Sequence, residues 1–96
     1  MTGNQYTAVV AFESGLKEGD SVEVCWTNCH RYYHATGTVA RVNAKSIRVA
    51  LATDVPTGMG SPYPAGREIV VPLIGDFRRW SPSNRVQPVG NYPTID

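Results

Sequence analysis

Four side chains that could bind a metal ion lie within one short segment. Residues 25–34 read CWTNCHRYYH and contain Cys25, Cys29, His30 and His34. Zinc prefers four such ligands in a tetrahedron, and structural sites usually take their two ligand pairs from separate segments. Here the two pairs abut, and a strand at Cys25 would point away from a common centre. We therefore expect no metal site and no cofactor in this chain.

The same residues are poor candidates for catalysis. A cysteine nucleophile requires a positioned base and an oxyanion site, and no acidic residue stands beside His30 or His34 in the sequence to orient an imidazole. A disulfide between Cys25 and Cys29 is geometrically conceivable, but a reducing compartment disfavours it. The sequence predicts a protein without catalytic residues, which is not an enzyme.

Molecular recognition is the better interpretation of this segment. Aromatic faces stack on nucleobases, hold methylated ammonium groups or receive polyproline segments. Trp26 is in phase with Val22 and Val24, which favours a place in the core. Tyr32 and Tyr33 are adjacent, so we expect one of them to be exposed in a loop that contacts a ligand.

A basic hairpin is the second candidate for binding. The net charge is only +1, yet residues 1–40 hold two basic and four acidic groups, whereas residues 41–85 hold seven basic and three acidic groups. A local basic surface of this kind contacts phosphates with few side chains. The residues expected on it are Arg41, Lys45 and Arg48, with Arg31 close by.

The third candidate is the segment 55–66, which reads VPTGMGSPYPAG. Its three prolines and three glycines exclude a regular element, and it is long for a connection in a small domain. Loops of this size often carry binding residues. We expect Tyr63 to contact a partner there, with a simple connection between two strands as the alternative.

The remaining chain has the sequence pattern of an all-β domain. Short β-branched runs alternate with Gly, Pro, Asn and Asp, and helical periodicity extends over no more than two turns. A single 3₁₀ turn is predicted at Ser81-Pro82, just before the last strand. The segments expected to form strands are 6–12, 21–26, 35–43, 46–54, 67–74 and 85–89.

Three local patterns refine this prediction. Val39 and Val42 are three residues apart, which predicts a β-bulge or a strong bend near Ala40-Arg41. Pro72 has no backbone N–H, which favours an edge position or a bulge. In the segment 46–54, residues expected to point inward alternate with residues expected to point outward. The inward residues are Ile47, Val49 and Leu51.

These segments resemble the SH3-like group of small barrels, which includes Tudor, Agenet and KOW-type domains. The resemblance is carried by EGDSVEVCW, GTVARVN, SIRVAL, REIVVPL and WSPSNRVQP. It implies a single five- to six-stranded SH3-like barrel over residues 18–89, preceded by a segment 1–17 and followed by a flexible tail 90–96. In this group the loop after the first long strand lines the ligand groove. An OB-like barrel is the alternative, although the longer helix between its middle strands is not visible here.

The whole pattern predicts one small all-β domain that acts by binding. No apolar run approaches the roughly 20 residues of a membrane span, and no signal peptide is visible, so a cytoplasmic setting is expected. Nucleic acid is the first choice of partner. The alternative is a protein–protein interaction module, or an inhibitor-type accessory protein, that docks through the 55–66 loop or a barrel edge. The ligand-binding residues that we expect are Arg31, Tyr32, Tyr33, Arg41, Lys45, Arg48 and Tyr63.

Overall fold

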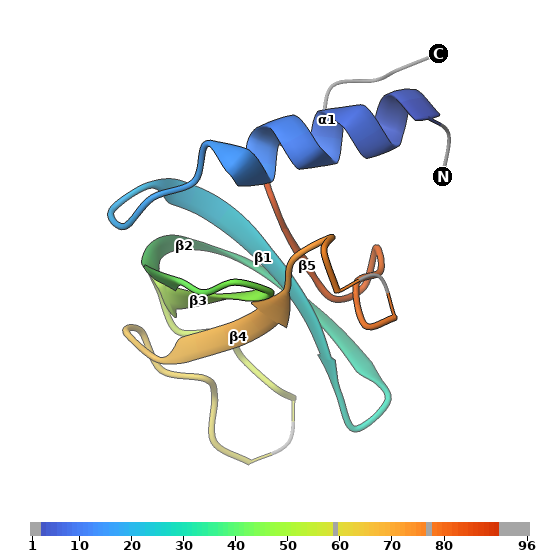
Figure 1. The fold of residues 1–96 in the computed structure, drawn as a ribbon. Helices are drawn as coiled ribbons and strands as arrows, with labels where there is room; N and C mark the ends of the chain where they lie inside the picture. Colours follow the sequence, from blue (N-terminus) through green and yellow to red (C-terminus); the bar gives the residue numbers. More distant parts are fainter. Residues whose placement is uncertain (1–2, 59, 77, 91–96) are drawn as a thin grey trace.

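The computed structural model describes residues 3–58, 60–76 and 78–90. This part of the chain forms one helix and five strands (Figure 1). They are α1 (Gly3–Ser14), β1 (Ser21–Asn28), β2 (Arg31–Val42), β3 (Ser46–Leu51), β4 (Glu68–Pro72) and β5 (Arg85–Gln87). Apart from Gly90, the tail expected at 90–96 lies outside the described residues.

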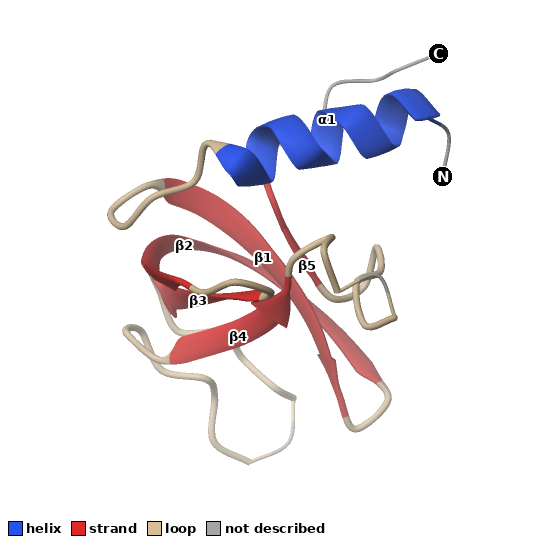
Figure 2. Cartoon of the chain, viewed as in Figure 1, coloured by secondary structure: helices blue, strands red, loops and turns tan. Residues whose placement is uncertain are grey.

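The five strands form a single antiparallel sheet in the order β4-β3-β2-β1-β5. Four consecutive strands make a meander, and the fifth returns to lie beside the first. The sheet curls into a half-barrel, with α1 across one end (Figure 2). The prediction of a small, mostly β domain is confirmed. The described strands do not complete a closed barrel, because β4 and β5 are the two edges of the sheet.

The core lies on the concave side of the curled sheet. Val22, Val24 and Trp26 of β1 are buried there, as their alternation predicted. The three inward positions predicted in β3 are also buried, each at most 3% exposed. Branched side chains from the other strands complete the cluster: Val39, Ile69, Val71 and Val86.

Two irregularities of the strands lie at the predicted positions. The pairing of β2 with β3 shifts register between Val39 and Arg41, which is the expected bulge. Pro72 ends β4, an edge strand, where its missing N–H leaves no ladder bond unmade. Upstream of the bulge, β2 passes so close to β3 that a Cβ at Gly37 would lie 2.5 Å from the carbonyl oxygen of Ala50. Only glycine fits at that crossing.

The strand predicted at 6–12 is wrong, because this segment belongs to α1. Phe12 of α1 and Leu16, just after the helix, pack against the core, and Val9 is buried. The buried Glu13 ties the helix to the sheet, since its Oε1 accepts a hydrogen bond of 2.8 Å from the backbone N–H of Ile74. Among the residues described, no helix has the length and hydropathy needed to cross a bilayer.

The 3₁₀ turn predicted at Ser81-Pro82 is also wrong. Ser81 and Asn84 instead form an isolated antiparallel bridge around a two-residue turn, with N–O distances of 3.4 and 3.1 Å. Pro82 suits the second position of such a reverse turn, where its fixed φ is favourable. The strand that follows is correspondingly short, Arg85–Gln87 instead of 85–89.

Candidate ligand-binding pocket

The segment CWTNCHRYYH is a tight hairpin and not the loop that we expected. β1 continues to Asn28, β2 begins at Arg31, and these two residues pair. The two residues between them, Cys29 and His30, have φ values of 51° and 64°. Positive φ at both central positions is the geometry of a type I′ turn, whose twist matches that of the flanking strands. The strand predicted to start at residue 35 therefore starts four residues earlier.

Strand pairing divides the aromatic residues of this hairpin between two faces. Trp26 lies opposite Tyr33, and their rings stack with centroids 5.4 Å apart and planes inclined by 20°. Tyr32, one residue earlier, lies opposite Thr27 and is 56% exposed on the other face. The expectation that one of the two tyrosines is exposed is thus confirmed for Tyr32.

Tyr63 reaches this cluster from the long loop between β3 and β4. An isolated bridge with Val55 holds it in place, and its ring meets Trp26 and Tyr33 edge-on at 5.3 Å. The Tyr63 hydroxyl accepts a hydrogen bond of 2.8 Å from Nδ2 of Asn28. Tyr63 is therefore a buried anchor of the loop, only 9% exposed.

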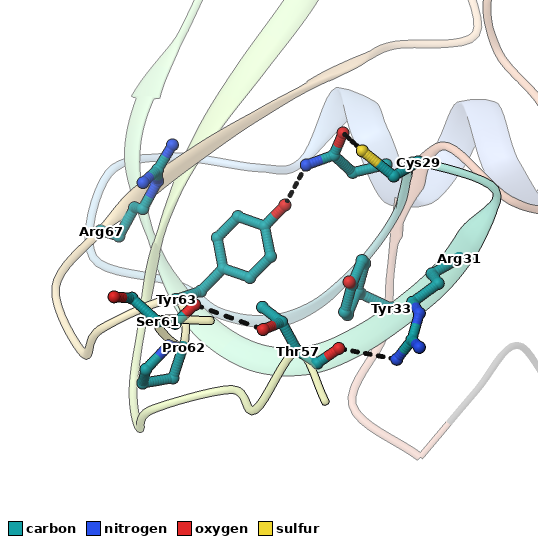
Figure 3. A pocket seen from close by; sticks show the side chains of 9 residues that line it. Cys29, Arg31, Tyr33, Thr57, Ser61, Pro62, Tyr63 and Arg67 are labelled. Atoms are coloured by element: carbon teal, nitrogen blue, oxygen red, sulfur yellow. Dashed lines mark hydrogen bonds between the residues drawn. The ribbon is translucent and has the colours of Figure 1, made fainter. Parts of the chain in front are cut away.

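A pocket of about 500 Å³ opens between the hairpin turn and this loop (Figure 3). Tyr33 and Tyr63 supply its aromatic surface, and the guanidinium of Arg67 lies 5.2 Å from the centre of the Tyr63 ring. Arg31 contributes a second guanidinium, whose Nη1 donates a bond of 2.7 Å to the backbone oxygen of Thr57. The other described lining residues are Asn28, Cys29, Ser61 and Pro62.

The charge of this pocket is positive. No acidic side chain is among its described lining residues, and within the described chain neither Arg31 nor Arg67 forms an ion pair. The sequence analysis did not identify Arg67 as a binding residue, since it follows a glycine with no other basic residue nearby. The pocket thus combines aromatic surfaces with two arginines that have no acidic partner among the residues that the structure describes.

The basic hairpin exists but lies elsewhere. Arg41 of β2 and Arg48 of β3 are direct cross-strand partners, and Lys45 is in the turn between these strands. Arg48 pairs with Glu68 at 3.4 Å, both side chains being about half exposed. Along β2, Arg41 is roughly 30 Å from Arg31 at the rise of an extended strand. The structure therefore does not join these three residues to the pocket.

The convex face of β1, β2 and β5 carries a polar network that the sequence analysis missed. Oε2 of Glu23 lies 3.1 Å from Nε2 of His34 and accepts a bond of 3.1 Å from Nε2 of Gln87. Gln87 Oε1 in turn accepts bonds from Arg85 and from the Cys25 thiol. An acidic residue does stand beside His34, contrary to our expectation, because strand pairing brings together residues 11 positions apart.

Two pKa shifts describe the electrostatics of this face. Partial burial raises the pKa of Glu23, but hydrogen bonds from Gln87 and His34 outweigh it and hold the pKa below its usual value of 4.5. Contact with Cys25, together with burial, raises the pKa of Tyr32 to about 12. Cys25 itself is 1% exposed, so a substrate cannot reach its sulfur although a histidine and a carboxylate are close.

Metal ligation has no geometric support in the described part of the chain. No group of three His, Cys, Asp or Glu side chains converges there. Both cysteines are free thiols, Cys25 buried and Cys29 exposed at the hairpin turn. The four residues that opened the sequence analysis are therefore distributed over a turn and one face of the sheet.

Comparison with known proteins assigns no family. No protein-family model matches the chain, and neither the curated proteins nor the solved structures contain a match. The functional argument consequently rests on the pocket and its surroundings.

Proposed function

We propose that this protein is a non-enzymatic binding module for single-stranded nucleic acid, and that the pocket between the β1–β2 hairpin and the 55–66 loop is its binding site. The observation that carries the proposal is the pairing of Tyr33 and Tyr63 with Arg31 and Arg67 in one hollow. Proteins that bind single strands combine aromatic platforms for bases with basic groups for phosphates. An unstacked base fits a pocket of this size, whereas a duplex presents no free base face.

The fold is compatible with this role. The order β4-β3-β2-β1-β5, a meander whose fifth strand returns beside the first, supports membership of the SH3-like group that the sequence resembles. In that group the loop after the first long strand lines the ligand groove, and here the β1–β2 hairpin lines the pocket. Arg41, Lys45 and Arg48 would serve as a separate phosphate contact for a strand long enough to reach them.

Titration of labelled oligonucleotides tests the proposal. A single-stranded oligonucleotide should bind more tightly than a duplex of the same sequence, and its affinity should fall as salt is raised from about 50 mM to about 200 mM, because bound arginines release counterions. Absence of binding at the lower salt concentration would refute the proposal. Equal affinity for the duplex would contradict the stacking role of the pocket.

A protein partner is the second candidate, and one observation favours it. β3 pairs with β2 only from Gly37 to Val42, so no described strand covers the outer edge of residues 31–35. An extended peptide could add a strand at this edge. Slowed amide hydrogen exchange at residues 31–35 in the presence of a captured protein partner, together with no oligonucleotide binding, would favour this candidate.

A further inference from the structure

A second hollow lies directly beside the pocket. It has a volume of about 510 Å³ and is lined by Arg31, Tyr32, Tyr33, Pro56, Thr57 and Gly58. Three of these residues, Arg31, Tyr33 and Thr57, also line the first pocket. The two hollows are therefore neighbours along the uncovered edge of β2, where both the Tyr33 side and the Tyr32 side of the strand are within reach.

Arg31 is the charged side chain shared by the two hollows. Arg31 extends from the start of β2 to the 55–66 loop, and its Nη1 is bonded to the Thr57 carbonyl oxygen at 2.7 Å. Gly58 makes room for it, because a Cβ at that position would lie 2.5 Å from the same nitrogen. Gly58 also has a positive φ of 78°, which disfavours any residue with a side chain.

The acceptor that holds Arg31 is a neutral carbonyl. Hydrogen bonds from a guanidinium to a phosphate are roughly twice as strong as bonds between neutral groups, and two of the arginine N–H groups can engage one phosphate. An anion placed between the hollows would therefore compete well with Thr57 for Arg31. Because Arg31 lines both hollows, the anion would lie between them.

We propose that the two hollows form one groove for two consecutive nucleotides of a single strand, with Arg31 binding the phosphate that joins them. This inference rests on the proposed function and adds a second base subsite to it. The first base lies against Tyr33, whose ring is held in place by the edge-on contact with the buried Tyr63. The second occupies the hollow beside Tyr32, whose side chain is 56% exposed. Arg67 lines only the first of the two hollows, so it belongs to the first base subsite.

Calorimetric titration with AMP and with the dinucleotide pApA tests the number of subsites. The dinucleotide should bind about tenfold more tightly, since each stacked base adds a comparable increment. Its affinity should also show the steeper salt dependence, because one more phosphate is bound. AMP and pApA of equal affinity would overturn the two-subsite groove and leave the proposed function intact, whereas binding of neither would overturn both.

The second subsite is tested by a matched pair of tyrosine variants. Tyr32→Ala should weaken pApA binding about tenfold and leave AMP binding unchanged. Tyr6→Ala is the control, because Tyr6 is equally exposed, at 55%, but lies on α1. An equal effect of Tyr32→Ala on both ligands, or no effect on either, would overturn the assignment of the second base to this hollow.

The position of Arg31 is tested without any ligand. Gly58→Ala and Gly60→Ala introduce the same backbone strain, since the two φ values are 78° and 77°, but a Cβ at Gly60 meets no atom within 4 Å. Gly58→Ala should therefore shift the Nε–Hε resonance of Arg31 in the NMR spectrum, because only this substitution displaces the end of the arginine side chain from Thr57. An unchanged Arg31 resonance in Gly58→Ala, or the same change in Gly60→Ala, would contradict the position of Arg31 on which the groove depends.

Discussion

Tyr63 meets Trp26 edge-on with ring centroids 5.3 Å apart, although the two residues belong to a long loop and to the first strand. Tyr33 contacts both of these rings. The resulting cluster of three rings holds an irregular loop in place as one wall of a pocket. The arginines of the pocket are positioned by the same residues, since Arg67 lies over Tyr63 and Arg31 is two residues from Tyr33. Loop order and pocket geometry therefore depend on one aromatic cluster.

The hydrogen bond between Tyr63 and Asn28 should contribute to stability. Tyr63→Phe keeps the ring and removes the hydroxyl that accepts from Asn28, so we expect a loss of about 1 kcal/mol in the free energy of unfolding. Asn28→Ala should have a similar effect, and the double variant should lose less than the sum of the two. Urea unfolding of all three variants measures this, and strict additivity would show that the bond contributes nothing.

Gly37 should tolerate no side chain. A Cβ there would lie 2.5 Å from the Ala50 carbonyl oxygen and 2.6 Å from Cγ1 of Val49, so β2 and β3 would have to separate. We expect Gly37→Ala to destabilise the fold by about 1–3 kcal/mol, as overpacking usually does. Gly75→Ala is the control, because a Cβ there meets no atom within 4 Å. Equal unfolding midpoints for the two variants would contradict the crossing of the strands.

The hairpin turn should be open to improvement. Cys29 and His30 both occupy the left-handed region, which is strained for residues with a side chain. Asn-Gly is the preferred pair for a type I′ turn, so the double variant Cys29→Asn/His30→Gly should raise stability by about 1 kcal/mol or more. Thermal unfolding checks this. A lower melting temperature would argue against the turn geometry.

Glu13 should make stability depend on pH. Burial raises its pKa above 4.5, partly offset by the hydrogen bond from the Ile74 N–H. Because the folded state binds the proton more tightly than the unfolded chain, this contribution is full below pH 4.5 and is lost as pH rises through the folded pKa.

A matched variant isolates that contribution. Glu13→Gln keeps an acceptor for the Ile74 N–H and does not titrate. The difference in unfolding free energy between Glu13→Gln and the parent should therefore increase in favour of the variant as pH rises from about 4 to about 7. A difference that stays constant over this range would show that Glu13 does not titrate abnormally. Glu23 has a lowered pKa and gives the opposite dependence of stability on pH. Its contribution is the same in the variant and the parent, so it cancels in the difference between them.

Local signals in the sequence predicted most of the sheet. Alternation placed Ile47, Val49 and Leu51 inward, and the spacing of Val39 and Val42 located the bulge. These features depend on neighbouring residues, which a sequence displays directly. The helix at the N-terminus was missed because the pair Val9-Val10 is typical of strands, whereas the contact of Phe12 with the core joins distant parts of the chain.

The site was predicted only in part, because it depends on distant contacts. Tyr33 and Arg31 were identified from their place in the segment CWTNCHRYYH, but Arg67 joins them only after the 55–66 loop has folded back onto Trp26. The turn at Cys29-His30 lacks the glycine that marks a type I′ turn, so the hairpin was taken for a loop. The pairing of Glu23 with His34 likewise follows from strand register.

The most direct test of the account compares two arginine pairs in one binding experiment. Fluorescence anisotropy with a labelled single-stranded oligonucleotide should show at least a tenfold loss of affinity for Arg31→Ala/Arg67→Ala, since two charged contacts are removed. Arg78→Ala/Arg79→Ala changes the net charge equally at two exposed residues that do not line the pocket, and should stay within about twofold of the parent, apart from general screening. Equal losses for the two pairs, or no loss for the first, would contradict the assignment of the pocket.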